Sequence, residues 1–274
     1  MSRLAPLFEK LKQEGRRAVV PYLVAGDPNE ALTVPLMHAL VDAGADIIEV
    51  GVPFSDPMSE GPTIQKAHER ALEGGTSLKS TLALVEDFRR TNITTPLVLM
   101  GYANPLERQG YAYVADACAD AGIDGLITVD LPPEEVAAMN TELQRRELDN
   151  IFLISPTTSD ERVATITQQA SGFIYYVALK GVTGAGNLDT AAVEAHLAII
   201  RAHSDLPVAV GFGIKDAETA ATVAGCADAV VVGSAMVDCI AAQYASESDP
   251  AAATEAAHSL ISTIRTGVNL ATSK

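Results

Sequence analysis

The sequence predicts an α/β fold, a single (β/α)8 barrel of the TIM type, from three observations. Eight short runs rich in Val and Ile alternate with longer amphipathic segments along the whole chain. The runs are almost continuously apolar, as parallel strands buried on both faces should be. Eight strand–helix units in 274 residues also match the usual size of such a barrel.

The expected strands follow one another in the order that a barrel requires. They are Val19–Val24, Ile47–Val50, Leu97–Met100, Gly125–Val129, Ile151–Ile154, Phe173–Val177, Val208–Val210 and Ala229–Val232. The clearest helical segments between them are Ala31–Ala43, Gly110–Ala121, Pro133–Arg146 and Thr190–His203. Pro28 and Pro133 stand at or near expected helix starts, where a missing N–H costs little.

Two further helices are expected outside the repeating units. Ser2–Glu14 should be an extra N-terminal helix that covers the bottom of the barrel, and Pro250–Arg265 should close it. No linker rich in Pro, Gly or Ser divides the chain, so one domain is expected over residues 1–274. The competing fold is a doubly wound open sheet, but the first strand is followed by Ala25–Pro28 and not by GxGxxG.

A short sequence pattern that occurs three times supports the barrel prediction. Residues 42–47, 120–125 and 224–229 each end a helix at a glycine and then enter a strand. Gly44, Gly122 and Gly225 are therefore expected in the left-handed conformation that ends many helices.

Composition excludes several classes of partner. With 19 Lys+Arg against 35 Asp+Glu, the net charge is −16, which argues against nucleic acid and anionic membrane surfaces. No run approaches the length of a membrane span, and the N-terminus lacks the apolar core of a signal peptide. The three cysteines have no CxxC spacing, so we expect reduced thiols in a cytoplasmic protein.

The chemistry is expected at the carboxyl-terminal ends of the strands, where barrel enzymes hold their active sites. Three loops there are rich in glycine: Lys180–Gly186, Gly211–Ile214 and Gly233–Met236. Small residues let backbone amides approach an anion, and the last two loops are where barrels often hold a phosphate. We therefore predict a phosphate site formed by backbone N–H groups.

Glu49 is the most informative acidic residue. It interrupts the apolar run at residues 47–50, so its side chain should point into the mouth of the barrel. Partial burial would raise its pKa and suit it to proton delivery. The following loop carries Asp56 and Glu60 and is stiffened by Pro53, Pro57 and Pro62.

These segments resemble one known family. EVGVPFSDPMSEGPTIQ from Glu49, GYANP from Gly101, KGVTGAG from Lys180, GFGI from Gly211 and GSAM from Gly233 are similar to the tryptophan synthase alpha subunit. The similarity spans nearly the whole chain. It implies a lyase of tryptophan biosynthesis that cleaves indole-3-glycerol phosphate to indole and glyceraldehyde 3-phosphate, with no metal or organic cofactor in this chain.

The resemblance also assigns roles to residues. Glu49 matches the glutamate that acts at indole C3, and Glu60 stands where the family has the aspartate that binds the indole N–H. Thr183 matches a threonine of the loop that closes over the substrate and orients the acid at position 60. The residues that match the substrate walls are Tyr22, Met100, Tyr175 and Phe212, and those that match phosphate contacts are Gly184, Gly213, Gly233 and Ser234.

The implied assembly is an α2β2 heterotetramer with a beta subunit that holds pyridoxal phosphate. On the resemblance, the residues that face this partner are Pro53, Asp56, Pro57, Asn104 and Pro132.

Other classes of activity fit the sequence less well. A Schiff-base aldolase would use Lys180, but this lysine opens a glycine-rich loop and is not expected in the desolvated site that a nucleophilic lysine needs. A zinc aldolase would need clustered ligands, whereas all five histidines fall on expected helices. The change at Glu60 also favours a catalytically weakened regulatory subunit, and the chain could instead be a stand-alone lyase.

Overall fold

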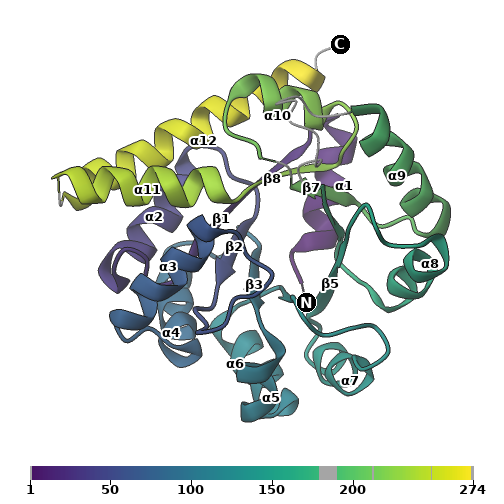
Figure 1. Ribbon diagram of the computed structural model, residues 1–274, viewed down its shortest axis with the longest axis horizontal. Helices are drawn as coiled ribbons and strands as arrows, with labels where there is room; N and C mark the ends of the chain where they lie inside the picture. Colours follow the sequence, from purple (N-terminus) through teal and green to yellow (C-terminus); the bar gives the residue numbers. More distant parts are fainter. Residues whose placement is uncertain (1, 179–189, 212, 248, 273–274) are drawn as a thin grey trace.

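The computed structural model describes residues 2–178, 190–211, 213–247 and 249–272. Its eight parallel strands form a closed barrel in the order β1 to β8, with β8 paired to β1. Helices surround this barrel on all sides in Figure 1. The strands are β1 (Ala18–Val24), β2 (Ile48–Gly51), β3 (Leu97–Gly101), β4 (Gly125–Thr128), β5 (Asp149–Ile154), β6 (Ile174–Val177), β7 (Val208–Gly211) and β8 (Ala229–Val232).

The predicted fold class is therefore confirmed, and every expected strand is present with ends that differ by at most two residues. The helices are α1 (Leu4–Gln13), α2 (Glu30–Asp42), α3 (Pro62–Glu73), α4 (Leu78–Arg89), α5 (Ala103–Gln109), α6 (Tyr111–Ala121), α7 (Ala137–Arg145), α8 (Asp160–Gln169), α9 (Thr190–His203), α10 (Ala217–Ala224), α11 (Ser234–Glu247) and α12 (Pro250–Thr272).

Two helices differ from their predicted bounds by more than two residues. Residues 133–136 form turns, so α7 begins at Ala137 and not at Pro133. The last helix, α12, continues beyond Arg265 because Ile261, Ile264 and Val268 extend one buried stripe along it. In Figure 1 this long helix lies beside α11.

Alternate residues of each strand point into the barrel, as the period of a strand requires. Near the amino-terminal end these inward residues, such as Val20, form one core with Leu4, Phe8 and Leu11 of α1. The intervening residues, such as Val19, face the surrounding helices in a second core. The extra N-terminal helix thus closes the bottom of the barrel, as predicted.

Aspartates hold the amino-terminal ends of three strands. Asp46, Asp124 and Asp228 accept hydrogen bonds from backbone amides of β1, β3 and β7, at 2.9, 2.8 and 3.0 Å respectively. Each carboxylate is also paired with an arginine. All three aspartates belong to the repeated segments of the sequence. The repeat therefore specifies this hydrogen bond between an aspartate and a strand, as well as a helix end.

The glycines of the same segments behave less uniformly than predicted. Gly44 and Gly122 have φ values of +102° and +90°, in the left-handed region. The expectation for Gly225 is wrong, because its φ is −65°. Its N–H bonds to the carbonyl oxygen of Ala221, so it continues the helical geometry of α10.

Candidate active site

Glu49 is a buried acid at the carboxyl-terminal end of the barrel. Its neighbours Ile48 and Val50 face the outer core, so the side chain of Glu49 faces the barrel interior. That side chain is only 1% exposed, and neither carboxyl oxygen has a hydrogen-bond partner among the described residues. Burial, and then the charge of Glu60, raise the pKa of Glu49 to about 8. A carboxyl in this state holds a proton at neutral pH and can deliver it.

Glu60 is the second carboxyl of the site. It is partly buried on the loop between β2 and α3, and its carbonyl oxygen accepts a hydrogen bond from Gln65 Nε2 at 2.9 Å. Burial raises the pKa of its carboxyl to about 7. Because Glu49 has the higher pKa, there is a window between about pH 7 and pH 8 in which Glu49 keeps its proton while Glu60 is ionised.

The loop that carries Glu60 is anchored at two points. The N–H of Phe54 donates to His68 Nδ1 at 3.0 Å, and the N–H of Ser59 donates to Tyr102 Oη at 3.2 Å. The ring of Phe54 also stacks on that of Tyr102, with centroids 5.2 Å apart. These contacts fit the stiff loop expected from its prolines, but neither His68 nor Tyr102 was a candidate from the sequence.

Tyr22, Met100 and Tyr175 lie around the two carboxyls. Burial and the charges of both glutamates raise the pKa of each tyrosine, and Met100 packs in one cluster with Tyr22 and in another with Tyr175. Each tyrosine hydroxyl covers a glycine at the end of the next strand. A Cβ at Gly51 would lie 2.3 Å from Tyr22 Oη, and one at Gly211 would lie 2.5 Å from Tyr175 Oη. Both glycines are therefore required by the walls of the site.

The expected phosphate contacts that the structure describes are Gly213, Gly233 and Ser234. Ser234 begins α11, and the carbonyl oxygen of Gly233 accepts the N–H groups of the first turn. A Cβ on Gly213 or on Gly233 would meet nothing within 4 Å, so the backbone faces open space there. The first amides of α11 are thus presented as a helix N-terminus that suits an anion.

Some expected site residues cannot be placed. Thr183, Gly184 and Phe212 lie outside the described residues, as does Lys180, the nucleophile that a Schiff-base aldolase would need. Within the described part of the chain, no group of three or more His, Cys, Asp or Glu side chains is arranged to hold a metal ion. All five histidines lie on helices, in agreement with the prediction.

The expected partner-facing residues lie at the carboxyl-terminal end of the barrel, on the loops after β2 and β4 and, for Asn104, on the first turn of α5. Four of them are exposed or half-buried: Asp56, Pro57, Asn104 and Pro132. Pro53 is buried, however, and offers little surface to a partner. Met58, on the same loop, is 74% exposed. The N–H of Ala103 donates to Asp130 Oδ1 at 2.7 Å and links the start of α5 to the loop after β4.

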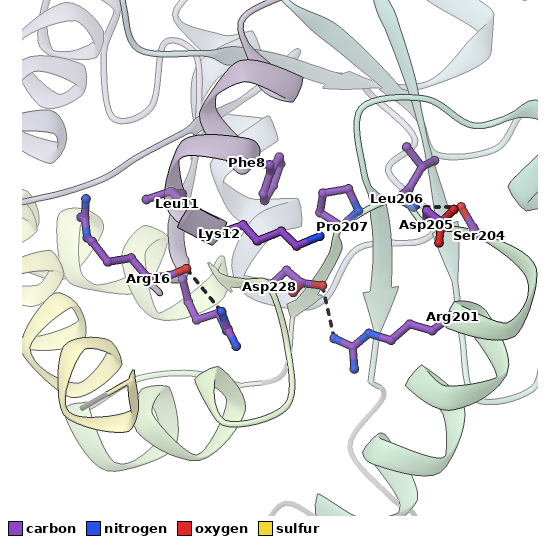
Figure 2. A pocket seen from close by; sticks show the side chains of 11 residues that line it. Phe8, Leu11, Lys12, Arg16, Arg201, Ser204, Asp205, Leu206, Pro207 and Asp228 are labelled. Atoms are coloured by element: carbon purple, nitrogen blue, oxygen red, sulfur yellow. Dashed lines mark hydrogen bonds and ion pairs between the residues drawn. The ribbon is translucent and has the colours of Figure 1, made fainter. Parts of the chain in front are cut away.

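A separate cavity of about 360 Å³ lies at the opposite end of the barrel, beside α1. Figure 2 shows Lys12, Arg16 and Arg201 around it, with Arg201 paired to Asp228 at 3.2 Å. Arg16 is paired with Glu14 at 3.2 Å. Arg16 and Arg201 are thus engaged by acids of the same chain. We place the active site at the other end, which holds the two buried or half-buried glutamates of raised pKa.

A (β/α)8 barrel with two neighbouring carboxyls of raised pKa at its carboxyl-terminal mouth has the architecture of an acid–base enzyme. Comparison with known proteins narrows this class. The family model described as tryptophan synthase alpha chain matches residues 8–265, and the chain belongs to that family.

Individual relatives agree with this assignment. The tryptophan synthase alpha chain of Thiobacillus denitrificans is 57% identical over 87% of each chain. That of Thioalkalivibrio sulfidiphilus is 55% identical over 97% of this chain and 98% of its own. Among solved structures, the alpha subunit from Legionella pneumophila superposes with a TM-score of 0.91 at 44% identity, covering 98% of this chain and 99% of that one.

No helix in the described ranges is both long and apolar enough to cross a membrane.

Proposed function

We propose that this chain cleaves indole-3-glycerol phosphate to indole and glyceraldehyde 3-phosphate with Glu49 and Glu60 as its two acid–base groups. Membership of the alpha chain family makes it a carbon–carbon lyase of tryptophan biosynthesis. The observation that carries the assignment of roles is the buried carboxyl of Glu49, which lacks a partner among the described residues and is raised in pKa by burial and by Glu60.

The first step is proton transfer to the ring. Glu49 enters as a neutral acid and gives its proton to indole C3, which leaves a positive charge shared by C2 and N1. Glu60, ionised above about pH 7, accepts the hydrogen bond of N1–H and stabilises that charge. A fixed carboxylate aimed at a developing charge in a water-poor site is worth far more than the same group in water.

The second step breaks the carbon–carbon bond. Glu49, now a carboxylate, takes the proton of the hydroxyl on the carbon attached to C3. The C–O bond becomes a carbonyl, and the electron pair of the C3–carbon bond returns to the ring and neutralises it. One carboxyl thus donates a proton and regains one, so the cycle uses only groups of the chain and needs no metal or organic cofactor.

The remaining residues hold the substrate. Tyr22, Met100 and Tyr175 form the wall around the indole, with Phe212 as a further member of that wall. The phosphate lies at the N-terminus of α11, against Gly233 and Ser234, with Gly184 and Gly213 completing the cradle and Thr183 closing over it. Open space beside Gly213 and Gly233 supports the cradle, because an anion needs direct access to backbone N–H groups.

The active assembly in this proposal is an α2β2 heterotetramer in the cytoplasm, with pyridoxal phosphate in the beta subunit. One solved relative with a TM-score of 0.86 and 36% identity comes from a structure described as tryptophan synthase from M. tuberculosis. In this proposal, the surface for the beta subunit is formed by Asp56 and Pro57 on the loop after β2, Asn104 at the start of α5, and Pro132 on the loop after β4. Met58 supplies an exposed apolar group within it.

Replacement of Glu49 by glutamine tests the proposal. Glutamine keeps the shape of the side chain but holds no transferable proton, so release of indole should fall to below about a hundredth of the parent rate. Calorimetric affinity for indole-3-glycerol phosphate should change little. A matched control is Glu86→Gln on the exposed face of α4, which should match the parent in both measurements.

Retention of a tenth or more of the activity by the Glu49→Gln variant would overturn its role. Assays of the parent chain with and without a cognate beta subunit distinguish this lyase from a regulatory subunit and from a stand-alone enzyme. A catalytically weakened regulatory subunit would stay inactive in both assays, and a stand-alone lyase would show full turnover without the partner.

A further inference from the structure

A buried hydrogen-bonded pair of side chains lies beside the two carboxyls. Tyr22 on β1 and His68 on α3 are 3% and 2% exposed, and Tyr22 Oη lies 3.3 Å from His68 Nε2. The other ring nitrogen, Nδ1, accepts the N–H of Phe54 at 3.0 Å. A neutral imidazole that accepts at Nδ1 carries its proton on Nε2, so His68 is the donor and Tyr22 Oη is the acceptor.

The histidine is neutral under working conditions. Burial lowers its pKa to about 4, so the ring carries one proton at neutral pH. The orientation of the ring is also constrained, because α3 is tied to the loop after β1. Arg70, two residues beyond His68, donates to both carboxyl oxygens of Asp27, at 2.6 and 3.0 Å.

This arrangement leaves the phenol proton of Tyr22 for another acceptor. One lone pair of the oxygen is used by His68, and the hydroxyl is confined above Gly51. Tyr22 and Glu49 are partners in the register of β1 and β2, so both side chains project into the mouth at one level. No described residue accepts from Tyr22, so the hydroxyl is an oriented donor beside the acid.

We propose that Tyr22, held by His68, positions the substrate by donating a hydrogen bond to a hydroxyl oxygen of its glycerol chain. This inference rests on the proposed function. The indole ring offers N–H, which is itself a donor, and the phosphate is assigned to the N-terminus of α11. The glycerol hydroxyls next to the bond that breaks are the remaining acceptors at the level of Glu49. His68 is thus a positioning residue that acts through Tyr22.

Ligand chemistry gives the first test. Tyr22→Phe removes only the hydroxyl and should lower kcat/KM for indole-3-glycerol phosphate about tenfold, as the loss of one neutral hydrogen bond does. The probe is indole-3-propanol phosphate, which keeps the indole and phosphate but lacks both glycerol hydroxyls. Its dissociation constant should stay within about twofold of the parent value. Tyr176→Phe, which removes a buried hydroxyl facing the outer core, is the matched control.

Two substitutions at His68 distinguish positioning from simple support of the loop. Asparagine places an acceptor where Nδ1 stands and keeps the bond from Phe54, but it loses the donor to Tyr22. Glutamine places its terminal amide where Nε2 stands. His68→Asn should therefore lower kcat/KM as Tyr22→Phe does, the double variant should fall no further, and His68→Gln should recover most of the loss.

Several results would overturn the inference. These are a parent-like kcat/KM in Tyr22→Phe, equal weakening of substrate and of indole-3-propanol phosphate, or multiplicative effects of Tyr22→Phe and His68→Asn. If the parent chain did not cleave indole-3-glycerol phosphate, the proposed function would be wrong. The role of Tyr22 could still be tested by calorimetric binding of indole-3-glycerol phosphate and indole-3-propanol phosphate to the parent and to Tyr22→Phe. Binding through the glycerol hydroxyls does not require turnover.

Discussion

At the scale of single residues, Glu49 occupies a place that is unfavourable for the fold. A carboxyl without described partners in the barrel interior is held there at a cost, because burial disfavours its charged form. Its pKa in the folded state, about 8, lies above the ordinary value of 4.5. Between these values the folded state binds more protons than the unfolded state, so stability falls as pH rises from about 4.5 to about 8.

The Glu49→Gln variant should therefore be more stable than the parent at alkaline pH. We expect its free energy of unfolding at about pH 8.5 to exceed the parent value by roughly 1–4 kcal/mol, and the gain to be small near about pH 4.5. Urea denaturation at both pH values measures the difference, with Glu86→Gln as the exposed control. An equal gain at the two pH values would mean that the effect does not arise from ionisation.

Glu60 stands where the resemblance implies an aspartate. Its charge raises the pKa of Glu49, and burial raises the pKa of its own carboxyl. Glu60→Ala should lower kcat by about a hundredfold or more, as loss of a preorganised charge does. Glu60→Asp should retain more activity than Glu60→Ala. The assignment would be wrong if Glu60→Ala kept near-parent cleavage while Asp56→Ala abolished it.

At the scale of elements, the N-terminus of α11 is the part of the chain that we propose to hold the substrate phosphate. A valine at position 233 would fill open space in the folded chain, so its side chain meets no protein atom nearby but does crowd a bound anion. Gly233→Val should raise KM for indole-3-glycerol phosphate about tenfold or more. Inhibition by indole, which carries no phosphate, should be unchanged. An equal loss of affinity for both ligands would place the phosphate elsewhere.

The positions of the strands were predictable from the sequence because the strands are largely buried. The strands are apolar on both faces, and their positions were found within two residues. The end of α12 was missed because Arg265, a charged residue that resembles a helix end, is in fact buried and pairs with Asp46. Gly225 was misassigned because a glycine at a helix end permits a left-handed conformation without requiring one.

The candidate site was predictable only in part. Glu49 was found because a charged residue inside an apolar run is unusual. His68 was not found, because it lies on an amphipathic helix where polar and charged residues are common and one more polar residue does not stand out. Its contact with Tyr22 joins residues 46 positions apart. Only the packing of α3 against β1 brings them together, and hydrophobic periodicity carries no information on that contact.

At the scale of the whole molecule, the two ends of the barrel differ in their residues. The aspartates of the repeated segments and α1 lie at the amino-terminal end. The two glutamates and the residues that we propose to face the partner lie at the other end. Exposed apolar residues occur at both ends, with Met58 at 74% and Ile93 at 71%. This pair allows a matched test of the partner surface.

Met58→Lys should weaken binding of a cognate beta subunit by about tenfold or more, because an apolar side chain that a partner buries contributes affinity and a buried unpaired charge opposes binding. Ile93→Lys makes the same chemical change at the other end and should leave that affinity within about twofold. Titration calorimetry measures both. Equal weakening by the two variants would mean that the partner does not select the loop of Met58.

The register that sets Tyr22 beside Glu49 also relates activity to the order of folding. β1 pairs with β2 on one side and with β8 on the other. The first strand of the chain therefore has both of its neighbours only after the last strand has paired with it. In proteins of this size, folding intermediates commonly have native-like secondary structure before their tertiary packing is complete. In a refolding experiment, the far-UV signal would therefore time the formation of the units. The return of indole release would time the closure of the ring.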